Sequence, residues 1–306
     1  MKSKISLPSY PFDYMVMGYC ALMALLILVL GRPLGEYSGE LVFYIGMSVL
    51  AFVIARYVDE TRGRVHAFVR LLYPAAMFTF FYSATGGTMF LLFDHFLDSG
   101  LVAFERATFG VNLTLFIDQH LLNVWATEIF SLTYFCYYLM IPGFFIFLFV
   151  KKDDEVTKIS LTAICLTFFV SYIVFFLYPI EGPRYFFAES YANGVDGPLF
   201  RQMVEMVIDN GAVRGGCMPS THFAVALVII LHSFKYYRRL GWVLLPVNLG
   251  LAIGTVWGRF HYISDVFVGG AIGAIATLIV WKYYERWTRE TSRCMSRKET
   301  EAVRVS

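Results

Sequence analysis

Residues 156–178 read VTKISLTAICLTFFVSYIVFFLY, and this stretch decides the fold class. It carries one charged side chain, that of Lys158. A membrane-spanning helix needs about 20 mostly apolar residues, and this run supplies them. Because similar apolar runs recur along the chain, the sequence predicts an all-α, polytopic membrane helix bundle. The eight predicted spans cover residues 14–30, 41–55, 71–93, 125–150, 156–178, 220–234, 241–257 and 266–283.

The composition of the whole chain agrees with a membrane protein. Of its 306 residues, 58% are hydrophobic and 16% are charged, whereas a typical globular domain is about half apolar and a quarter charged. The net charge of +2, with no basic stripe, argues against a nucleic-acid partner. The five cysteines do not have the spacing of a metal-binding or redox motif. They are Cys20, Cys136, Cys165, Cys217 and Cys294.

Lysine and arginine concentrate in alternate loops. They cluster within residues 56–70, 151–158 and 235–239 and again after residue 282. Because cytoplasmic loops are enriched in these residues, both termini are predicted to be cytoplasmic. We therefore expect two N-terminal spans within residues 1–65, a six-span unit within 66–285, and a basic cytoplasmic tail over 286–306. The loops at 94–120 and 179–218 then face the periplasm, the cell exterior or an organelle lumen.

Residues 97–123 mix apolar side chains with Asp98, Glu105, Arg106 and Asp118. This pattern favours an amphipathic segment lying along the outer membrane surface, and a solvated loop is the alternative.

Three polar clusters fall at span ends on the predicted outer side. They read YPIEGPR at 178–184, RGGCMPSTH at 214–222 and RFHYISD at 259–265. Ionisable groups at the edge of a membrane are costly to bury, so their presence at one depth indicates a functional site.

His261 and Asp265 are four residues apart, which places them on one face of a helix. A carboxylate bonded to one ring nitrogen fixes the tautomer and leaves the other nitrogen able to act as a nucleophile. The alternative is a capped helix start that contains a satisfied histidine.

Pro219, Ser220, Thr221 and His222 indicate a helix start, because proline suits the first turn and Ser or Thr suits the N-cap. A helix start presents N–H groups that bind phosphate, and we expect Ser220 and Thr221 to contact it. His222 would protonate a leaving alkoxide as an imidazolium. A plain helix cap is the alternative, but a cap alone does not require a histidine.

Arg184, Arg214 and Arg259 add positive charge to the three clusters. Cationic side chains stabilise the negative charge of a transferring phosphoryl group. Any one of them could instead be a snorkelling headgroup contact. We rank Arg184 and Arg259 above Arg214 as phosphate ligands.

The ordered clusters resemble the three motifs of the type 2 phosphatidic acid phosphatase superfamily, which run Lys-x6-Arg-Pro, Pro-Ser-Gly-His and Ser-Arg-x5-His-x3-Asp. The resemblance covers roughly residues 71–283 and implies a six-helix core preceded by two extra spans. It also implies that His261 forms a phosphohistidine, that His222 is the acid and that neither a metal ion nor another cofactor is needed. The matching residues are Arg184 in the first motif, Pro219, Ser220 and His222 in the second, and His261 and Asp265 in the third.

The chain departs from these motifs in informative ways. Leu177 stands where the first motif has lysine, and Thr221 replaces the glycine of the second. Gly254 and Thr255 replace the Ser-Arg of the third, while Arg259 precedes His261 by two residues. The run TVWGRFHY at 255–262 looks like the branch that contains fungal inositol phosphorylceramide synthases. Phosphate binding should therefore depend on Arg184 and Arg259.

The favoured function is a metal-independent integral membrane lipid phosphatase that removes a phosphate from a lipid phosphate at the exoplasmic face through a phosphohistidine intermediate. A phosphotransferase that moves a phospho-headgroup to a lipid or polyol hydroxyl is the alternative, because the sequence does not identify the acceptor. A transporter is disfavoured, since the ionisable residues gather at one face and not at the midplane. An intramembrane serine protease would need Ser220 beside His261 and leaves the arginines unexplained.

Overall fold

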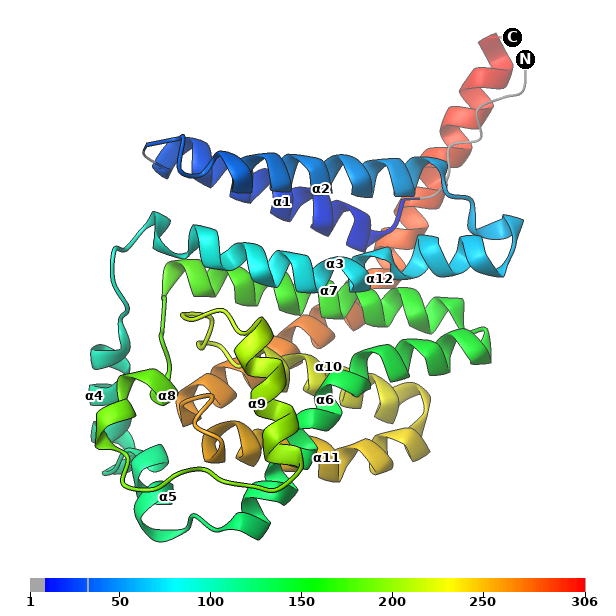
Figure 1. The fold of residues 1–306 in the computed structure, drawn as a ribbon. Coiled ribbons are helices and arrows are strands. Elements are labelled where there is room, and N and C mark those ends of the chain that lie inside the picture. The colour runs from blue at the N-terminus through cyan, green and yellow to red at the C-terminus, as the bar shows by residue number, and fades with distance from the viewer. Residues whose placement is uncertain (1–8, 32, 306) are drawn as a thin grey trace.

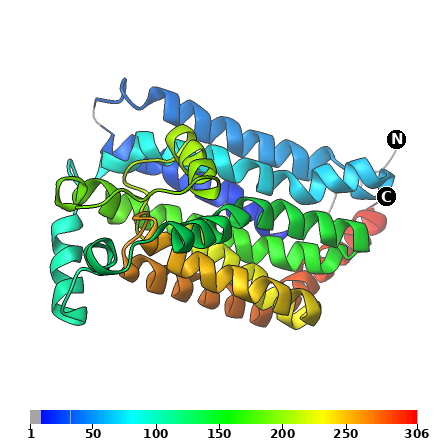
Figure 2. The same cartoon turned by 60° about the horizontal axis from the view of Figure 1, so that its bottom comes forward.

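The computed structural model describes residues 9–31 and 33–305, with side chains through residue 287. Within this part of the chain the regular elements are helices, so the predicted all-α membrane bundle is confirmed. Seven of these helices are long and apolar enough to cross a membrane, and they run side by side (Figures 1 and 2). They are α1 (Pro11–Leu30), α2 (Ser38–Tyr57), α3 (Arg64–Thr88), α6 (Val124–Lys151), α7 (Asp154–Leu177), α11 (Arg238–Trp257) and α12 (Ile263–Val305).

The sixth predicted span is the shorter helix α10 (Thr221–Tyr236). Its 16 residues rise about 24 Å, less than the roughly 30 Å of a bilayer's hydrocarbon core. α10 packs against α7, α11 and α12, and Val225, Val228 and Ile229 on it are fully buried. Because the neighbouring helices surround it, α10 does not need to meet lipid along its whole length.

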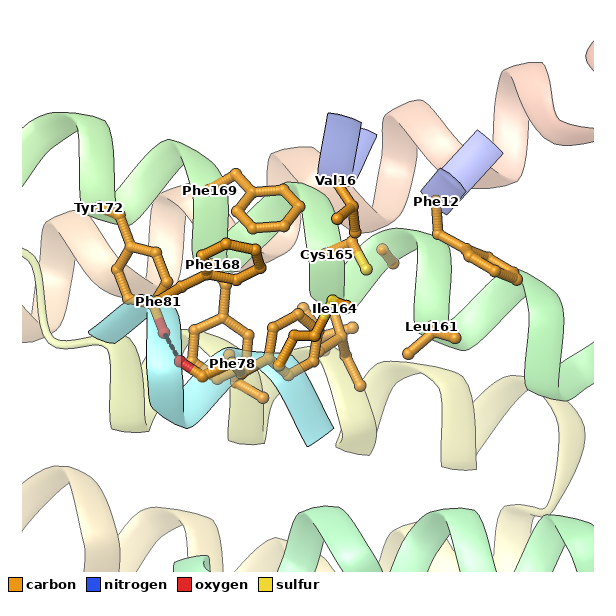
Figure 3. Close-up of a cluster of buried hydrophobic side chains, with 14 of the residues drawn as sticks. Phe12, Val16, Phe78, Phe81, Leu161, Ile164, Cys165, Phe168, Phe169 and Tyr172 are labelled. Carbon is orange, nitrogen blue, oxygen red and sulfur yellow. Dashed lines mark hydrogen bonds between the residues drawn. The ribbon is translucent and has the colours of Figure 1, made fainter. Parts of the chain in front are cut away.

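α7 lies at the centre of the bundle and packs against α1, α3, α10 and α12. Leu161, Ile164 and Cys165 have no exposed surface, as expected for a helix that is apolar on all sides. Figure 3 shows aromatic side chains of α7 meeting those of α3, and the ring centroids of Phe168 and Phe78 are 4.4 Å apart. Tyr19 of α1 stacks on Phe169 at 4.6 Å. The Tyr172 hydroxyl donates to the carbonyl oxygen of Phe78 at 3.1 Å, which gives this polar group a partner inside the core.

A buried ion pair attaches the N-terminal helix α1 to α3. Arg70 donates to Asp13 at 2.6 and 2.9 Å, and the Tyr73 hydroxyl donates to the same carboxylate at 2.7 Å. Burying such a pair is tolerable because the hydrogen bonds satisfy both charged groups. α1 in turn packs along α2, so the two N-terminal helices are fixed to the rest of the bundle.

The remaining short helices gather mainly at the end of the bundle where α10 and α12 begin (Figure 1). α4 and α5 bend by 69° where they meet, and together they account for most of the predicted amphipathic segment 97–123. The opposite end holds the start of α1 and the far end of α12 (Figure 1). The short elements are η1 (Glu60–Arg62), η2 (Met89–Leu91), α4 (Asp98–Phe109), α5 (Leu113–His120), α8 (Pro183–Phe186), η3 (Ala188–Ser190) and α9 (Phe200–Gly211).

The acidic side chains of the 97–123 segment point into the protein, so it is not a solvated loop. Asp98 accepts bonds from the N–H groups of Glu181 and Gly182 at 2.7 and 2.9 Å. Glu105 accepts from the N–H of Ser264 at 2.8 Å. The segment thereby holds two of the three polar clusters in place.

Candidate active site

His261 lies in the turn between α11 and α12 and is 4% exposed. Its Nδ1 is 2.8 Å from the carbonyl oxygen of Cys217 and 3.4 Å from Asp265 Oδ2. Because a carbonyl oxygen can only accept a hydrogen bond, Nδ1 must carry the proton. In the neutral ring, Nε2 is then the nitrogen that keeps its lone pair. The structure brings His261 and Asp265 together, but they do not share a helix face as expected, because α12 begins only at Ile263. The shorter bond, which sets the tautomer, goes to the backbone of Cys217.

Asp265 has no exposed surface and organises the turn around His261. Its Oδ2 accepts from the N–H of Tyr262 at 2.8 Å and from the thiol of Cys217 at 3.0 Å. Its carbonyl oxygen accepts from the N–H of Ser220 at 2.9 Å, which ties the start of α12 to the start of α10. The second and third sequence clusters are thus joined through one residue.

Cys217 was missed as a site residue because its partners come from a distant part of the sequence. Burial raises the pKa of its thiol well above the usual value, and the nearby Asp265 carboxylate adds to this effect. The sulfur therefore keeps its proton and acts as a hydrogen-bond donor. The Cys217 Sγ, a ring nitrogen of His261 and a carboxylate oxygen of Asp265 lie within 4.8 Å of one another. A metal ion there would have to displace both protons of this network.

His222 lies in the first turn of α10 and lines the same cavity as His261. The two imidazole centroids are 5.9 Å apart. His222 Nε2 is 3.4 Å from the Tyr134 hydroxyl, and Tyr137 packs against the ring with a centroid distance of 4.6 Å. Among the described residues, Nδ1 of His222 has no hydrogen-bond partner. The geometry leaves this nitrogen available for another hydrogen bond.

Ser220 is the N-cap residue of α10, as the sequence indicates. It has no exposed surface, and within the described residues its Oγ has no hydrogen-bond partner. The structure thus provides no Ser220–His261 bond of the kind a serine protease would need. Thr221 is also buried and lines the same cavity as the two histidines.

The three predicted arginines occupy different environments, and each meets a carboxylate. Arg184, on α8, pairs with Glu205 at 2.6 Å. Burial alone would lower the pKa of Arg184, but the Glu205 contact raises it above the usual value. This pairing keeps the guanidinium charged at the edge of the site.

The other two arginines contribute unequally to the site. Arg259 binds Asp118 and the carbonyl oxygen of Asn193, and its guanidinium lies 3.6 Å from the centre of the Tyr191 ring. Arg214 pairs with Glu181, and its side chain is 61% exposed. The order in which the sequence ranked the arginines thus agrees with their burial.

The family model of the PAP2 superfamily matches residues 99–280. The chain belongs to the PAP2 superfamily. A PA-phosphatase related-family protein of Dictyostelium discoideum is 26% identical over 53% of this chain and 33% of its own length. The bacitracin transport permease protein BcrC of Bacillus licheniformis is 27% identical over 28% of this chain and 38% of its own length. The chain therefore matches well under half of each curated relative, and no solved structure matches it.

The PAP2 match includes α9, which carries a fourth arginine that the sequence reasoning missed. Arg201 is 7% exposed, pairs with Glu205 and donates to the carbonyl oxygen of Gly258 at 3.3 Å. Its guanidinium lies 5.0 Å from the ring centre of Phe260, the neighbour of His261. Burial lowers its pKa, and the nearby charges of Arg184 and Arg259 act in the same direction. The Arg201–Glu205 spacing of four on a helix was the signal that could have found this pair.

A cavity of about 1090 Å³ extends from the PAP2 motifs into the bundle. Arg184, His222 and His261 line its polar end. Its other walls are mainly aromatic and aliphatic, and they include residues of α2, α3 and α6. Arg259 and Asp265 are not among the residues that line this cavity, although their neighbours Phe260 and His261 are.

Proposed function

We propose that this protein removes phosphate from a lipid phosphate through a phosphohistidine at His261. The observation that carries the proposal is the His261 tautomer, because the Cys217 carbonyl holds a proton on Nδ1 and so makes Nε2 the nucleophilic nitrogen of the neutral ring. Membership of the PAP2 superfamily indicates a phosphatase or phosphotransferase. The apolar cavity beside the histidines favours a substrate with a hydrophobic tail.

In the first step, His261 Nε2 attacks phosphorus, and the bond from phosphorus to the lipid oxygen breaks. His222 gives its proton to the departing alkoxide. In the second step, water attacks the phosphohistidine and loses a proton to His222. The N–P bond breaks, and inorganic phosphate leaves.

The α10 helix start supplies donors to the phosphate oxygens in this scheme. Its N–H groups favour an anion, and Ser220 Oγ, which lacks a partner among the described residues, is available to donate. Arg184 and Arg259 would stabilise the charge that develops on the transferring group. Glu205 and Asp118 hold these two arginines in place before the phosphate arrives.

We infer that the site faces the exoplasmic side and that both termini are cytoplasmic. The loops rich in lysine and arginine lie at the end of the bundle opposite the histidines, as the positive-inside rule expects. On this view, residues 286–306 form a basic cytoplasmic extension.

Cysteine labelling tests this orientation. Cys217 is too buried to report topology, so Asp196→Cys and Arg238→Cys are better probes. An impermeant thiol reagent should label the first and not the second in intact cells, and the opposite result would reverse the orientation.

A phosphotransferase shares the first step and differs only in what attacks the phosphohistidine. The run at 255–262 favours this alternative, because it looks like the inositol phosphorylceramide synthase branch. Purified protein should therefore be assayed with a panel of lipid phosphates, with and without a polyol. Release of inorganic phosphate that a polyol does not change supports the phosphatase. A phosphorylated polyol would instead assign the transferase.

Rapid-quench labelling tests the intermediate directly. With a lipid carrying a radiolabelled phosphate, the protein should acquire label that is labile in acid and stable in base, as expected for a phosphohistidine. Label with the opposite stability, or turnover without any labelled protein, would contradict the proposed mechanism.

A further inference from the structure

One wall of the cavity comes from outside the region that the PAP2 model matches. The matched residues are 99–280, whereas α2 contributes Phe43, Met47, Leu50 and Ile54 to the cavity wall. These four residues are spaced by four, three and four positions, so they share one face of α2. α2, the second of the two N-terminal helices, therefore forms part of the cavity wall and is not only a neighbour of the catalytic bundle.

The dimensions of this wall suit a hydrocarbon chain. From Phe43 to Ile54, α2 rises about 16 Å. One leaflet of a bilayer is about 15 Å of hydrocarbon, half of the roughly 30 Å core. The cavity of about 1090 Å³ runs from the histidines at its polar end to Ile54 and Phe68. The cavity is therefore suited to an amphiphilic ligand that has one polar head and an extended apolar tail.

α2 is held at a fixed distance from α3, so the cavity has a defined width. Phe43 and Tyr44 pack on Phe81 with ring centroids 6.0 and 6.5 Å apart. Glu40 lies so close to Gly87 of α3 that a Cβ at that glycine would be 2.2 Å from its Oε1. The buried Asp13–Arg70 pair fixes α1, which packs along α2. A wall fixed in this way can discriminate between tails of different length.

We propose that α2 binds the acyl tail of the substrate, so that the N-terminal helix pair sets the preference for tail length. This inference rests on the proposed lipid phosphatase function. The occupant is the tail of the lipid phosphate, because the cavity opens directly onto His222 and His261.

The variant Met47→Trp tests the inference, because it fills the cavity at the middle of the α2 wall. Each buried methylene contributes about a factor of four to binding. Met47→Trp should therefore lower kcat/KM for dioleoyl phosphatidate by about tenfold or more. The loss should shrink as the tail shortens, so it should be smaller for dioctanoyl phosphatidate and smallest for a water-soluble phosphate ester without a tail. Val49→Trp is the matched control, since Val49 lies on the same helix but is 55% exposed and does not line the cavity.

Binding provides a second readout that does not depend on turnover. Dioleoyl phosphatidate should raise the Tm of wild type and of Val49→Trp in detergent, but not that of Met47→Trp. Equal effects of tail length in wild type and Met47→Trp would overturn the tail proposal. If instead the lipid stabilises wild type but no phosphate ester is ever cleaved, the proposed phosphatase function fails and tail binding stands.

Discussion

The two ends of the cavity are built in different ways. The end with His222 and His261 is framed by hydrogen bonds that are accepted by the carboxylates of Asp265 and Asp98 and by the carbonyl oxygen of Cys217. Apart from Asp98, these residues belong to the PAP2-matched region. The other end is walled by apolar residues of α2 and α3, which the match does not include. Directional bonds fix atoms at the site of reaction, whereas apolar packing sets only shape and volume. Substitutions at the two ends should therefore have separable effects.

The largest effect is expected at the polar end, from His261→Ala. Without the nucleophile, kcat should fall by about ten-thousandfold or more for every substrate, whatever the tail. The phosphoenzyme should also disappear in rapid-quench labelling. His222→Ala should still form the phosphoenzyme when the substrate has a good leaving group, since that step no longer needs an acid. Near-normal activity in His261→Ala would refute the mechanism.

A smaller loss is expected from Arg184→Ala, at about a hundredfold in kcat, by analogy with removing one preorganised donor. Arg184→Lys should recover only part of this, because lysine cannot bind two phosphate oxygens in a planar fork. Arg214→Ala is the matched control, because that side chain is 61% exposed and pairs only at the rim. Equal losses in the Arg184 and Arg214 variants would mean that Arg184 has no special contact with phosphate.

These two predictions concern residues that the sequence itself identified. Long apolar runs indicate the helices, and the motifs place Ser220 and Asp265 at helix starts, with His261 in the turn just before α12. The sequence could not show that the Cys217 carbonyl binds His261, because that contact joins positions 44 residues apart. Nor could it show that Asp98 and Glu105, which look like the polar face of an amphipathic segment, turn inward to bind the loops of the site. Such partners depend on packing that no local pattern encodes.

Asp265→Asn tests the polar end of the cavity further, because it changes the hydrogen bonds around His261 and leaves that nucleophile in place. In a triad whose carboxylate alone holds the imidazole, the corresponding change costs about 10⁴ in kcat. Here Nδ1 is 2.8 Å from the Cys217 carbonyl and 3.4 Å from Asp265. We therefore expect a loss of only about tenfold, and the tail-length preference should not change. A loss as large as that of His261→Ala would show that Asp265, and not the backbone, holds the imidazole.

The smallest effect is expected from metal chelation, which should leave activity unchanged. Cys217, His261 and Asp265 lie close enough to hold a metal ion. Whether activity depends on a metal ion at this end of the cavity therefore has to be tested. However, the thiol donates to Asp265 and the His261 Nδ1 proton points at a carbonyl, so both groups are already used as donors. Wild-type protein treated with EDTA should therefore retain full turnover. Loss of activity that a divalent ion restores would make these three side chains ligands, and His261 could then no longer be the nucleophile in the form proposed.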